Sequence, residues 1–214
     1  MKKKLKIACV AYVFVFCIAA LACQADVINI IQNSDMESNT GGVVDAWLLD
    51  SWGSNRAYAY TTEYSHSATH SIKLYNASDT AYASGDWYQN AAVTAGTEYT
   101  FTGWVKGVNI ELDTGGHAGI GYKWLDAGGS QIGNVGEIYI SSGTTDWTLL
   151  TRTVVAPENA VQVKFYTIMY KTKGDVYTDD MSVTYTSIPE PATLSLLMGV
   201  SLLNFLFSKK VKRQ

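Results

Sequence analysis

The chain has 214 residues, with 16 basic and 19 acidic side chains and a formal net charge of −3. The charges are unevenly placed: eight of the basic residues lie at the two tips, and residues 26–187 hold 8 basic against 18 acidic side chains. Such an acidic body lacks the basic surface that displaces counterions from phosphate, which excludes a nucleic-acid-binding function. The length allows one domain with a substantial core.

Residues 1–25 have the pattern of a secretory signal peptide. A tip with four Lys is followed by an apolar run from Ile7 to Ala22 and then by small residues. Cleavage by signal peptidase after Ala25 fits the small residues there. Cleavage after Ala22 would instead leave Cys23 at the new N-terminus, as in a lipoprotein. An uncleaved membrane anchor is the third alternative.

The cysteines agree with export. All three, Cys9, Cys17 and Cys23, lie in the leader. Cleavage after Ala25 leaves a domain without thiols, in which neither a disulfide framework nor a thiolate metal site can form. The stability of such a domain must come from its core or from a metal held by oxygen ligands.

Residues 26–187 predict one all-β domain. Short runs rich in Thr, Tyr, Val, Ile and Trp alternate with clusters of Gly, Asn, Ser and Asp, as in a sandwich or barrel. Turn signals include Gly115-Gly116 and Pro157-Glu158-Asn159. The predicted strands are Val27–Gln32, Tyr58–Thr62, Ser71–Tyr75, Trp87–Val93, Glu98–Lys106, Gly119–Leu125, Glu137–Ile140, Trp147–Val155, Val161–Tyr170 and Asp175–Tyr185.

Alternation along the strands assigns side chains to faces. Phe101 and its neighbours of the same parity form an apolar face, whereas Trp104 lies on the opposite, polar one. Trp147 is assigned to the core because Leu149 and Val155, on the same face, are apolar.

Several segments, in order along the chain, resemble the jelly-roll carbohydrate-binding modules of families four and nine, which belong to the galactose-binding-like sandwiches. The similar segments are Asn33–Glu37, Ser67–Leu74, Val93–Lys106, Trp124–Ile132, Asp146–Leu150 with Ala156-Pro157, and Gly174–Val183. The sequence departs from the module pattern at Met36, where Phe is usual, and at Ala68, where Gly is usual. The resemblance implies a jelly-roll β-sandwich that binds carbohydrate.

Aromatic side chains are the expected carbohydrate-binding residues. Rings with a polar edge suit a wet surface, where they stack on a sugar while neighbouring side chains form hydrogen bonds with its hydroxyls. Each of these rings could equally be a core or sheet-surface residue, because Trp and Tyr are common on strands. The predicted carbohydrate-binding residues are Trp47, Trp52, Arg56, Tyr58, Trp104, Tyr122, Trp124 and Tyr166.

Acidic residues suggest a structural calcium ion. The resembled modules bind calcium where their first and last strands meet, and Glu37, Asp179 and Asp180 match those positions. Calcium prefers several carboxylate and carbonyl oxygens. Because adjacent strand residues point to opposite faces, we expect only one of the two aspartates to be a ligand. A solvated acidic turn is the alternative.

The C-terminal residues 188–214 combine Pro189-Glu190-Pro191, an uncharged stretch over residues 192–208 and a basic tail. Seventeen helical residues reach about 26 Å, enough to cross a thin hydrocarbon core. The basic tail would remain in the cytoplasm. The combination resembles the PEP-CTERM sorting signal, which implies an exopolysaccharide-producing bacterium, transient anchoring in the inner membrane and processing by an exosortase-like protease. A plain tail anchor is the alternative.

The sequence gives little support for catalysis. His66 and His70 have zinc-like spacing only on a helix, and this stretch is predicted to be turn and strand. No nucleophile elbow or phosphate loop occurs. We therefore predict a non-enzymatic, exported surface or matrix protein that binds polysaccharide. The alternatives are a structural matrix protein without a sugar site, and a small glycan hydrolase with two carboxylates across a cleft.

Overall fold

The computed structural model describes residues 25–50, 52–77 and 81–187, and all regular structure in these ranges is β. Residues 28–185 form one compact unit. The strands are β1 (Asp26–Asn29), β2 (Asn39–Thr40), β3 (Val43–Val44), β4 (Leu48–Leu49), β5 (Arg56–Thr61), β6 (Ser71–Asn76), β7 (Ala83–Ala92), β8 (Glu98–Leu125), β9 (Gln131–Tyr139), β10 (Gly143–Val155) and β11 (Gln162–Ser187). The predicted all-β class is confirmed.

Both predicted targeting segments lie outside the described residues, which include neither residues 1–24 nor residues 188–214 with the Pro189-Glu190-Pro191 motif. Within the described part of the chain, no helix is long and apolar enough to cross a membrane.

Two pairs of predicted strands are each a single long strand. The strands predicted on either side of Gly115-Gly116 are continuous as β8, and the two predicted at the C-terminal end of the domain are continuous as β11. The glycine pair therefore marks a bend within a strand and not a turn between strands. The two-residue strands β2, β3 and β4 were not predicted, since so short a segment shows no alternation.

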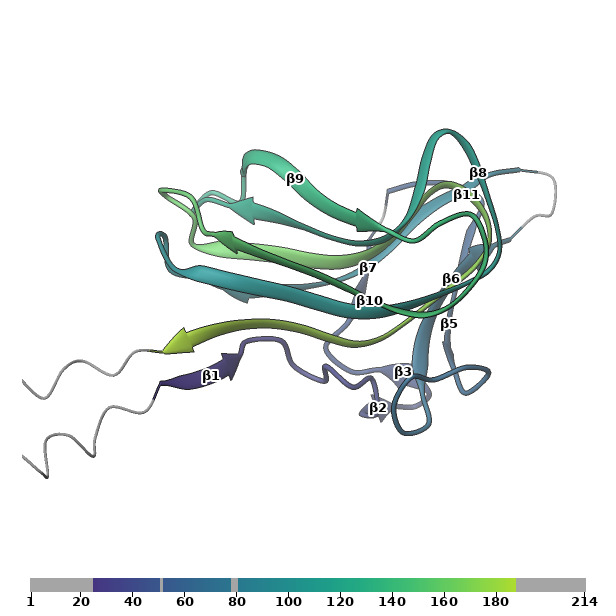
Figure 1. Cartoon of the computed structure of the whole chain (residues 1–214), viewed down its shortest axis with the longest axis horizontal. Coiled ribbons are helices and arrows are strands. Elements are labelled where there is room, and N and C mark those ends of the chain that lie inside the picture. The colour runs from purple at the N-terminus through teal and green to yellow at the C-terminus, as the bar shows by residue number, and fades with distance from the viewer. Residues whose placement is uncertain (1–24, 51, 78–80, 188–214) are drawn as a thin grey trace, which may run out of the picture. The chain divides into compact units, whose positions relative to one another are not determined.

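β8 and β11 pair along almost their whole length, and this antiparallel ribbon bends back on itself (Figure 1). The pairing register shifts near Thr172, between a part that joins Gln162–Tyr170 to His117–Leu125 and a part that joins Thr172–Thr184 to Thr100–Leu112. Positive φ angles mark the bend in both strands, at Asn109 (55°) and Gly174 (92°) among others. One long ribbon thus contributes to both layers of a sandwich.

Gly174 is required at this bend. Its φ of +92° lies in the left-handed region, and a Cβ placed on it would lie 2.4 Å from the carbonyl oxygen of Asn109. A side chain would therefore push the two strands of the ribbon apart where they turn.

The other strands extend the two halves of the ribbon into two layers. One layer, the pocket sheet, consists of β4, β7, β9 and the halves of β8 and β11 that contain His117–Leu125 and Gln162–Tyr170. The other layer, the back sheet, consists of β1, β5, β6, β10 and the remaining halves of β8 and β11. The short β2–β3 pair stands apart from both.

The core fills the space between the two layers. Phe101 of the back sheet is fully buried and stacks on Tyr122 of the pocket sheet, with ring centroids 4.2 Å apart. The ring centroids of Phe165 and Trp124 each lie 5.6 Å from that of Phe101. Aromatic rings from both layers therefore pack together around Phe101 in the core.

The assignment of Trp147 to the core was wrong. Leu149, one of the two apolar residues on which the assignment depended, pairs with Trp104, whereas Leu150 pairs with Gly103. Leu150 is buried, whereas Leu149 is 47% exposed and Val155 is also exposed. Apolar residues at alternate positions did not identify the core face, because the solvent-facing side of this strand carries them too.

We predict that F101A will destabilise the domain by about 3–5 kcal/mol, since it removes a buried ring that both layers contact. The free energy of unfolding, measured by urea denaturation, checks this. L149A is the matched control and should change stability by less than about 0.5 kcal/mol, because Leu149 faces solvent. Equal losses in both variants would contradict the described register.

Candidate functional site

A cavity of about 380 Å³ opens on the outer face of the pocket sheet. We call it the outer pocket. Its volume is in the range of sites for small molecules. It is lined by Asp50, Trp52, Asp86, His117, Lys123, Gln131, Val135, Glu137, Lys164, Tyr166, Ile168 and Tyr170. The pocket thus combines aromatic rings with several charged and polar groups.

One wall of the outer pocket holds a buried ion-pair triad. Lys164 of β11 pairs with Asp50 and, at 3.1 Å, with Asp86 of β7. The Lys164 ammonium also lies 4.0 Å from the centroid of the Tyr88 ring. Lys164 and Asp86 are 5% and 3% exposed, so removing either partner would leave an uncompensated buried charge.

Asp86 has an unused oxygen. Its Oδ2 is paired with Lys164, but Oδ1 accepts no hydrogen bond of normal geometry from any residue in the described ranges. Burial raises the pKa of Asp86, and the charge of Lys164 and a hydrogen-bonding contact from the Trp52 side chain oppose that rise. A buried carboxylate oxygen on a pocket wall is suited to accept a hydrogen bond from a ligand.

The opposite wall is organised around Glu137 of β9. Its Oε1 accepts a hydrogen bond from the Tyr166 hydroxyl at 2.9 Å, and its Oε2 accepts one from the Tyr139 hydroxyl at 2.6 Å. The Nε2 of His117 lies 3.3 Å from Oε2. Burial raises the pKa of Tyr139 to about 12, and the Glu137 carboxylate contributes to that rise. Glu137 therefore fixes two rings and an imidazole.

A glycine makes the contact between Tyr166 and Glu137 possible. Gly121 lies between these residues in the register of β11, β8 and β9. A Cβ on Gly121 would meet the Tyr166 ring at 2.5 Å. Because position 121 has no side chain, the Tyr166 ring can cross β8 and reach the glutamate.

Two further rings border the pocket. Trp52 follows β4, and its ring centroid lies 6.4 Å from that of Tyr170. Arg56 supports this loop from behind: its guanidinium donates to the carbonyl oxygens of Gly53 at 2.7 Å and Asp50 at 3.1 Å, and its Nε donates to the Tyr58 hydroxyl. Of the predicted carbohydrate-binding residues, Trp52 and Tyr166 line the pocket, while Arg56 and Tyr58 hold its loop.

Three other predicted carbohydrate-binding residues are core residues. Trp47 is buried and donates from Nε1 to the carbonyl oxygen of Asn33 at 3.0 Å. Tyr122 and Trp124 are buried against Phe101. The outer face of this part of β8 carries Gly121 and Lys123 instead, and Lys123 lines the pocket.

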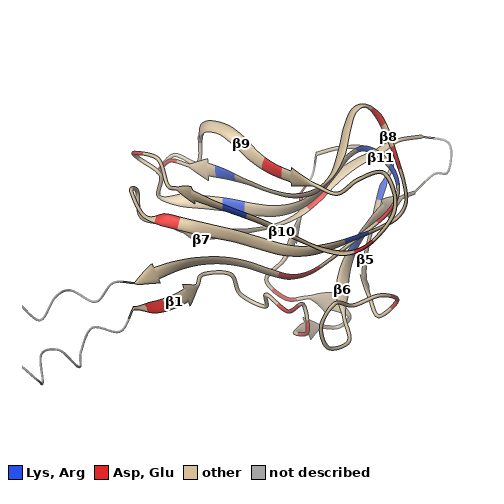
Figure 2. Cartoon of the chain, in the orientation of Figure 1, with Lys and Arg blue, Asp and Glu red and all other residues tan. Residues whose placement is uncertain are grey.

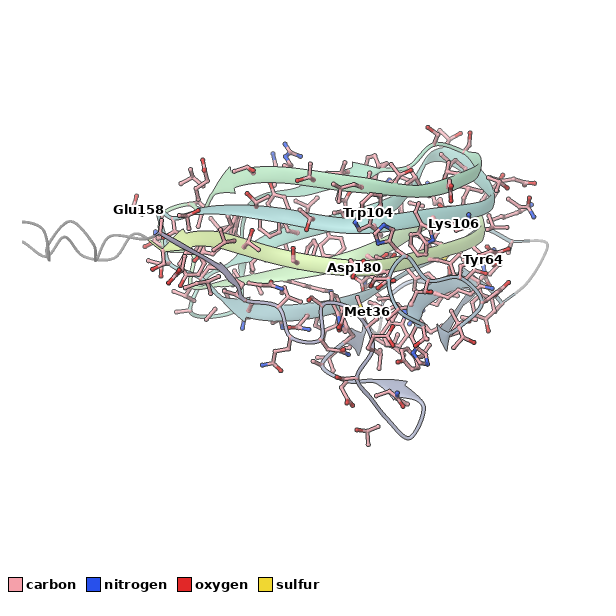
Figure 3. The ribbon with its side chains drawn as sticks, turned by 60° about the horizontal axis from the view of Figure 1, so that its bottom comes forward. Met36, Tyr64, Trp104, Lys106, Glu158 and Asp180 are labelled. Atoms are coloured by element: carbon pink, nitrogen blue, oxygen red, sulfur yellow. The ribbon has the colours of Figure 1, made fainter. Side chains whose placement is uncertain are left out.

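Trp104 lies on the back sheet, away from the residues of the outer pocket. His66 stacks on it with ring centroids 3.9 Å apart, and Trp147 meets the other edge of His66 at 5.8 Å. Figure 3 shows Trp104 beside Lys106, with Asp180 on the neighbouring strand. One face of the indole is therefore already covered.

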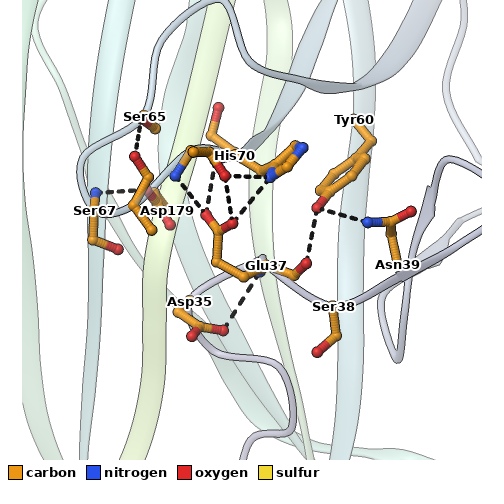
Figure 4. A network of polar contacts seen from close by, with 12 residues as sticks. Asp35, Glu37, Ser38, Asn39, Tyr60, Ser65, Ser67, His70 and Asp179 are labelled. Atoms are coloured by element: carbon orange, nitrogen blue, oxygen red, sulfur yellow. Dashed lines mark hydrogen bonds and ion pairs between the residues drawn. The ribbon is translucent and has the colours of Figure 1, made fainter.

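The predicted calcium residues hold a loop. Glu37 accepts hydrogen bonds at Oε1 from the backbone N–H of Thr69 (2.9 Å) and His70 (2.7 Å). Its Oε2 accepts one from the Thr69 hydroxyl at 2.7 Å and lies 3.0 Å from His70 Nδ1 (Figure 4). Burial opposes the charge on Glu37, but these hydrogen bonds outweigh it and lower the pKa to about 2.

Asp179 and Asp180 hold the preceding residues of the same loop. Asp179 is fully buried, and its Oδ2 accepts from the backbone N–H of His66 at 2.8 Å and of Ser67 at 3.0 Å. Oδ1 of Asp180 accepts a hydrogen bond from the Ser67 hydroxyl at 2.7 Å, and its Oδ2 lies 2.6 Å from His66 Nδ1. Burial raises the pKa of Asp179 to about 6, against the effect of these N–H groups.

The arrangement of these carboxylates does not fit a calcium ion. All six carboxylate oxygens of Glu37, Asp179 and Asp180 already accept a hydrogen bond or lie against an imidazole nitrogen. Oδ1 of Asp179, for example, accepts a hydrogen bond from the backbone N–H of Asp180. In residues 25–50, 52–77 and 81–187, no three His, Cys, Asp or Glu side chains gather closely enough to hold a metal ion. Calcium binding stays a prediction of the sequence.

Comparison with known proteins shows similarity in fold. No protein-family profile and no curated protein matches the chain. Among solved structures it is similar to a xylan-binding domain, CBM22-1 of Paenibacillus barcinonensis Xyn10C, with a TM-score of 0.50 and 11% identity over 77% of this chain and 97% of that one.

Two larger proteins contain a similar part. The enzymatically active domain of tailspike protein 4 of bacteriophage CBA120 matches with a TM-score of 0.57 and 14% identity over 73% of this chain. An arabinose-bound GH51 α-L-arabinofuranosidase matches with a TM-score of 0.53 and 14% identity over 74% of it. This chain spans only 21% and 26% of their lengths, so the shared feature is a sandwich within a longer protein.

Most residues of the outer pocket were not predicted as site residues. Asp50 follows β4, a strand too short to predict, and Asp86 precedes the predicted start of β7. Alternation along the predicted strand Val161–Tyr170 does place Lys164, Tyr166 and Tyr170 on one face, opposite the apolar Val163, Phe165 and Met169. That polar alternation, on a strand whose other face is apolar, was the available signal for the pocket floor.

We predict that E37A will loosen the loop at residues 65–70, because it removes the acceptor for two backbone N–H groups and costs roughly 1–2 kcal/mol. Hydrogen exchange should show faster exchange of the Thr69 and His70 amides. E63A is the control, since Glu63 is an exposed carboxylate that pairs with Lys73. Unchanged protection in E37A would contradict the clamp.

Proposed function

We propose that the protein binds carbohydrate, without catalysis, in the outer pocket. The observation that carries the proposal is the pocket itself, in which rings of Trp52, Tyr166 and Tyr170 surround hydrogen-bonding groups on a rigid sheet. A sugar presents apolar faces to rings and hydroxyls to polar side chains, so both sets of groups have a use. Jelly-roll carbohydrate-binding modules, which the chain resembles in sequence, use this chemistry.

The fold similarity supports the same function. The similar domain of Paenibacillus barcinonensis is described as xylan-binding, and this chain covers nearly all of it. The pocket carboxylates are engaged in structural contacts: Glu137 takes two tyrosine hydroxyls, and Asp86 pairs with Lys164. Such contacts suit a binding site better than a pair of glycosidase carboxylates, one of which must release a proton.

Export and sorting complete the proposal. The leader would direct the chain out of the cytoplasm, and the Pro189-Glu190-Pro191 segment would present it to an exosortase-like protease. After transient anchoring in the inner membrane, the sandwich would reach the cell surface or the extracellular matrix. There it would bind an exopolysaccharide.

We predict that W52A will weaken polysaccharide binding by about tenfold or more, because aromatic anchors dominate binding in such pockets. Native affinity electrophoresis through gels containing different polysaccharides measures this with residues 26–187, which include the compact unit Ile28–Tyr185. W104A is the matched control, since Trp104 packs under His66 on the other sheet and should leave binding unchanged.

Two outcomes would overturn the carbohydrate proposal. A folded domain whose mobility no polysaccharide changes would favour the alternative, a structural matrix or adhesion protein without its own sugar site. Loss of binding in W104A together with full binding in W52A would move the site to the back sheet.

We predict that replacing Pro189, Glu190 and Pro191 by Ala will block C-terminal processing in a bacterium that carries an exosortase. The full chain should then accumulate in the inner membrane as a longer form, detected by mass spectrometry of fractionated cells. The control replaces Ser187, just upstream, by Ala. Normal processing of the triple variant would contradict the sorting proposal.

A further inference from the structure

We propose that the outer pocket recognises a polysaccharide that carries free amino groups, with one sugar ammonium bound at Oδ1 of Asp86. This inference rests on the proposed function, because it assigns the charge of the ligand to the same pocket. It assigns a ligand class, glycans with glucosamine-type residues, on the basis of the charges and contacts described above.

The first observation is the unused oxygen of Asp86. The residue is 3% exposed, it lines the pocket, and its Oδ1 accepts no normal hydrogen bond within the described residues. A buried carboxylate oxygen without a donor is costly, and a ligand donor would remove that cost. An ammonium provides both the donor and the opposite charge, and such charge-assisted bonds are the stronger class.

The second observation is the charge balance around that oxygen. Lys164 is one cation against the two carboxylates of Asp50 and Asp86, so the triad keeps a formal charge of −1 when both are ionised. Glu137 adds a further negative charge on the opposite wall, where it accepts hydrogen bonds from the hydroxyls of Tyr139 and Tyr166 and lies 3.3 Å from His117 Nε2. Lys123 is the second lysine of the lining, so the lining itself holds three carboxylates against two lysines, and Arg56 contacts the Asp50 carbonyl.

The third observation is the position of the rings. Trp52 and Tyr170 lie 6.4 Å apart at the pocket, and the Trp52 side chain lies close enough to Asp86 to affect its pKa. A cation held near an aromatic face gains roughly 0.5–2 kcal/mol in proteins. The same wall thus holds both a carboxylate and aromatic rings that could contact an ammonium.

The net charge of residues 26–187 is also negative. Residues 26–187 carry 18 acidic and 8 basic side chains, and Figure 2 shows acidic positions in both layers of the sandwich. A negative body raises the local concentration of a cationic polymer and accelerates its association, whereas it repels an anionic one. An acidic glycan is therefore the disfavoured ligand.

Lys123 separates these two possibilities. It lines the pocket from β8 and lies opposite Lys164 in the register, so two cations are cross-strand neighbours. If the pocket bound an anionic sugar, Lys123 would be its partner. If the pocket binds an ammonium at Asp86, Lys123 repels it, and removing its charge should strengthen binding.

The test is isothermal titration of residues 26–187 with glucosamine oligomers, the N-acetylated oligomers of equal length, galacturonate oligomers and spermidine. We expect glucosamine oligomers to bind at least about tenfold more tightly than their N-acetylated counterparts. K123Q should tighten glucosamine binding roughly two- to fivefold, and D86N should weaken it about tenfold or more.

The outcomes distinguish the two proposals. Equal binding of glucosamine and N-acetylated oligomers would overturn the amino-sugar assignment and leave carbohydrate binding intact, whereas no binding of any glycan would count against both. Weaker glucosamine binding in K123Q, tighter binding of galacturonate oligomers, or binding of spermidine as tight as that of the oligomers would also overturn the assignment. Because K123Q alters a partly exposed lysine, its result stays decisive if D86N does not fold.

Discussion

The bend in the β8–β11 ribbon is the constraint on which the rest of the structure depends. Because both strands continue through the bend, one half of the ribbon becomes the centre of each layer, and Phe101 comes to lie on Tyr122 and Phe165. The close approach of Gly174 to the backbone of the neighbouring strand permits this turn. Core packing and the curvature of the pocket sheet therefore have a common origin.

The outer pocket uses the face of the ribbon that the core leaves free. Phe165 points inward, so its neighbours Lys164 and Tyr166 must point outward, where Asp86 and Glu137 hold them from the strands on either side. A lysine that is 5% exposed can exist on this outer face only because two carboxylates compensate it. The polar groups of the pocket are thus fixed by the same alternation that builds the core.

The sequence predicted the all-β class, most strand positions and the inward face of Phe101, since these follow from composition and alternation. It could not predict which face of β10 is buried, because the apolar residues Leu149 and Val155 lie on the exposed face and Leu150 on the buried one. The pocket depends on long-range pairs such as Lys164 with Asp86, 78 residues apart, which no local pattern contains. Alternation along the strand predicted only that Lys164 and Tyr166 lie on the face opposite the core.

The loop that follows β5 is held by carboxylates from two distant parts of the chain. Carboxylates at Glu37, Asp179 and Asp180 match the calcium positions of the resembled modules, yet here they bind four backbone N–H groups and two imidazoles of residues 66–70. Each imidazole also stacks on a ring, Trp104 for His66 and Tyr60 for His70. Because backbone N–H groups supply the donors and the imidazoles add packing, the loop is held by contacts from the protein itself. A cation at this site would have to displace those donors before it could bind.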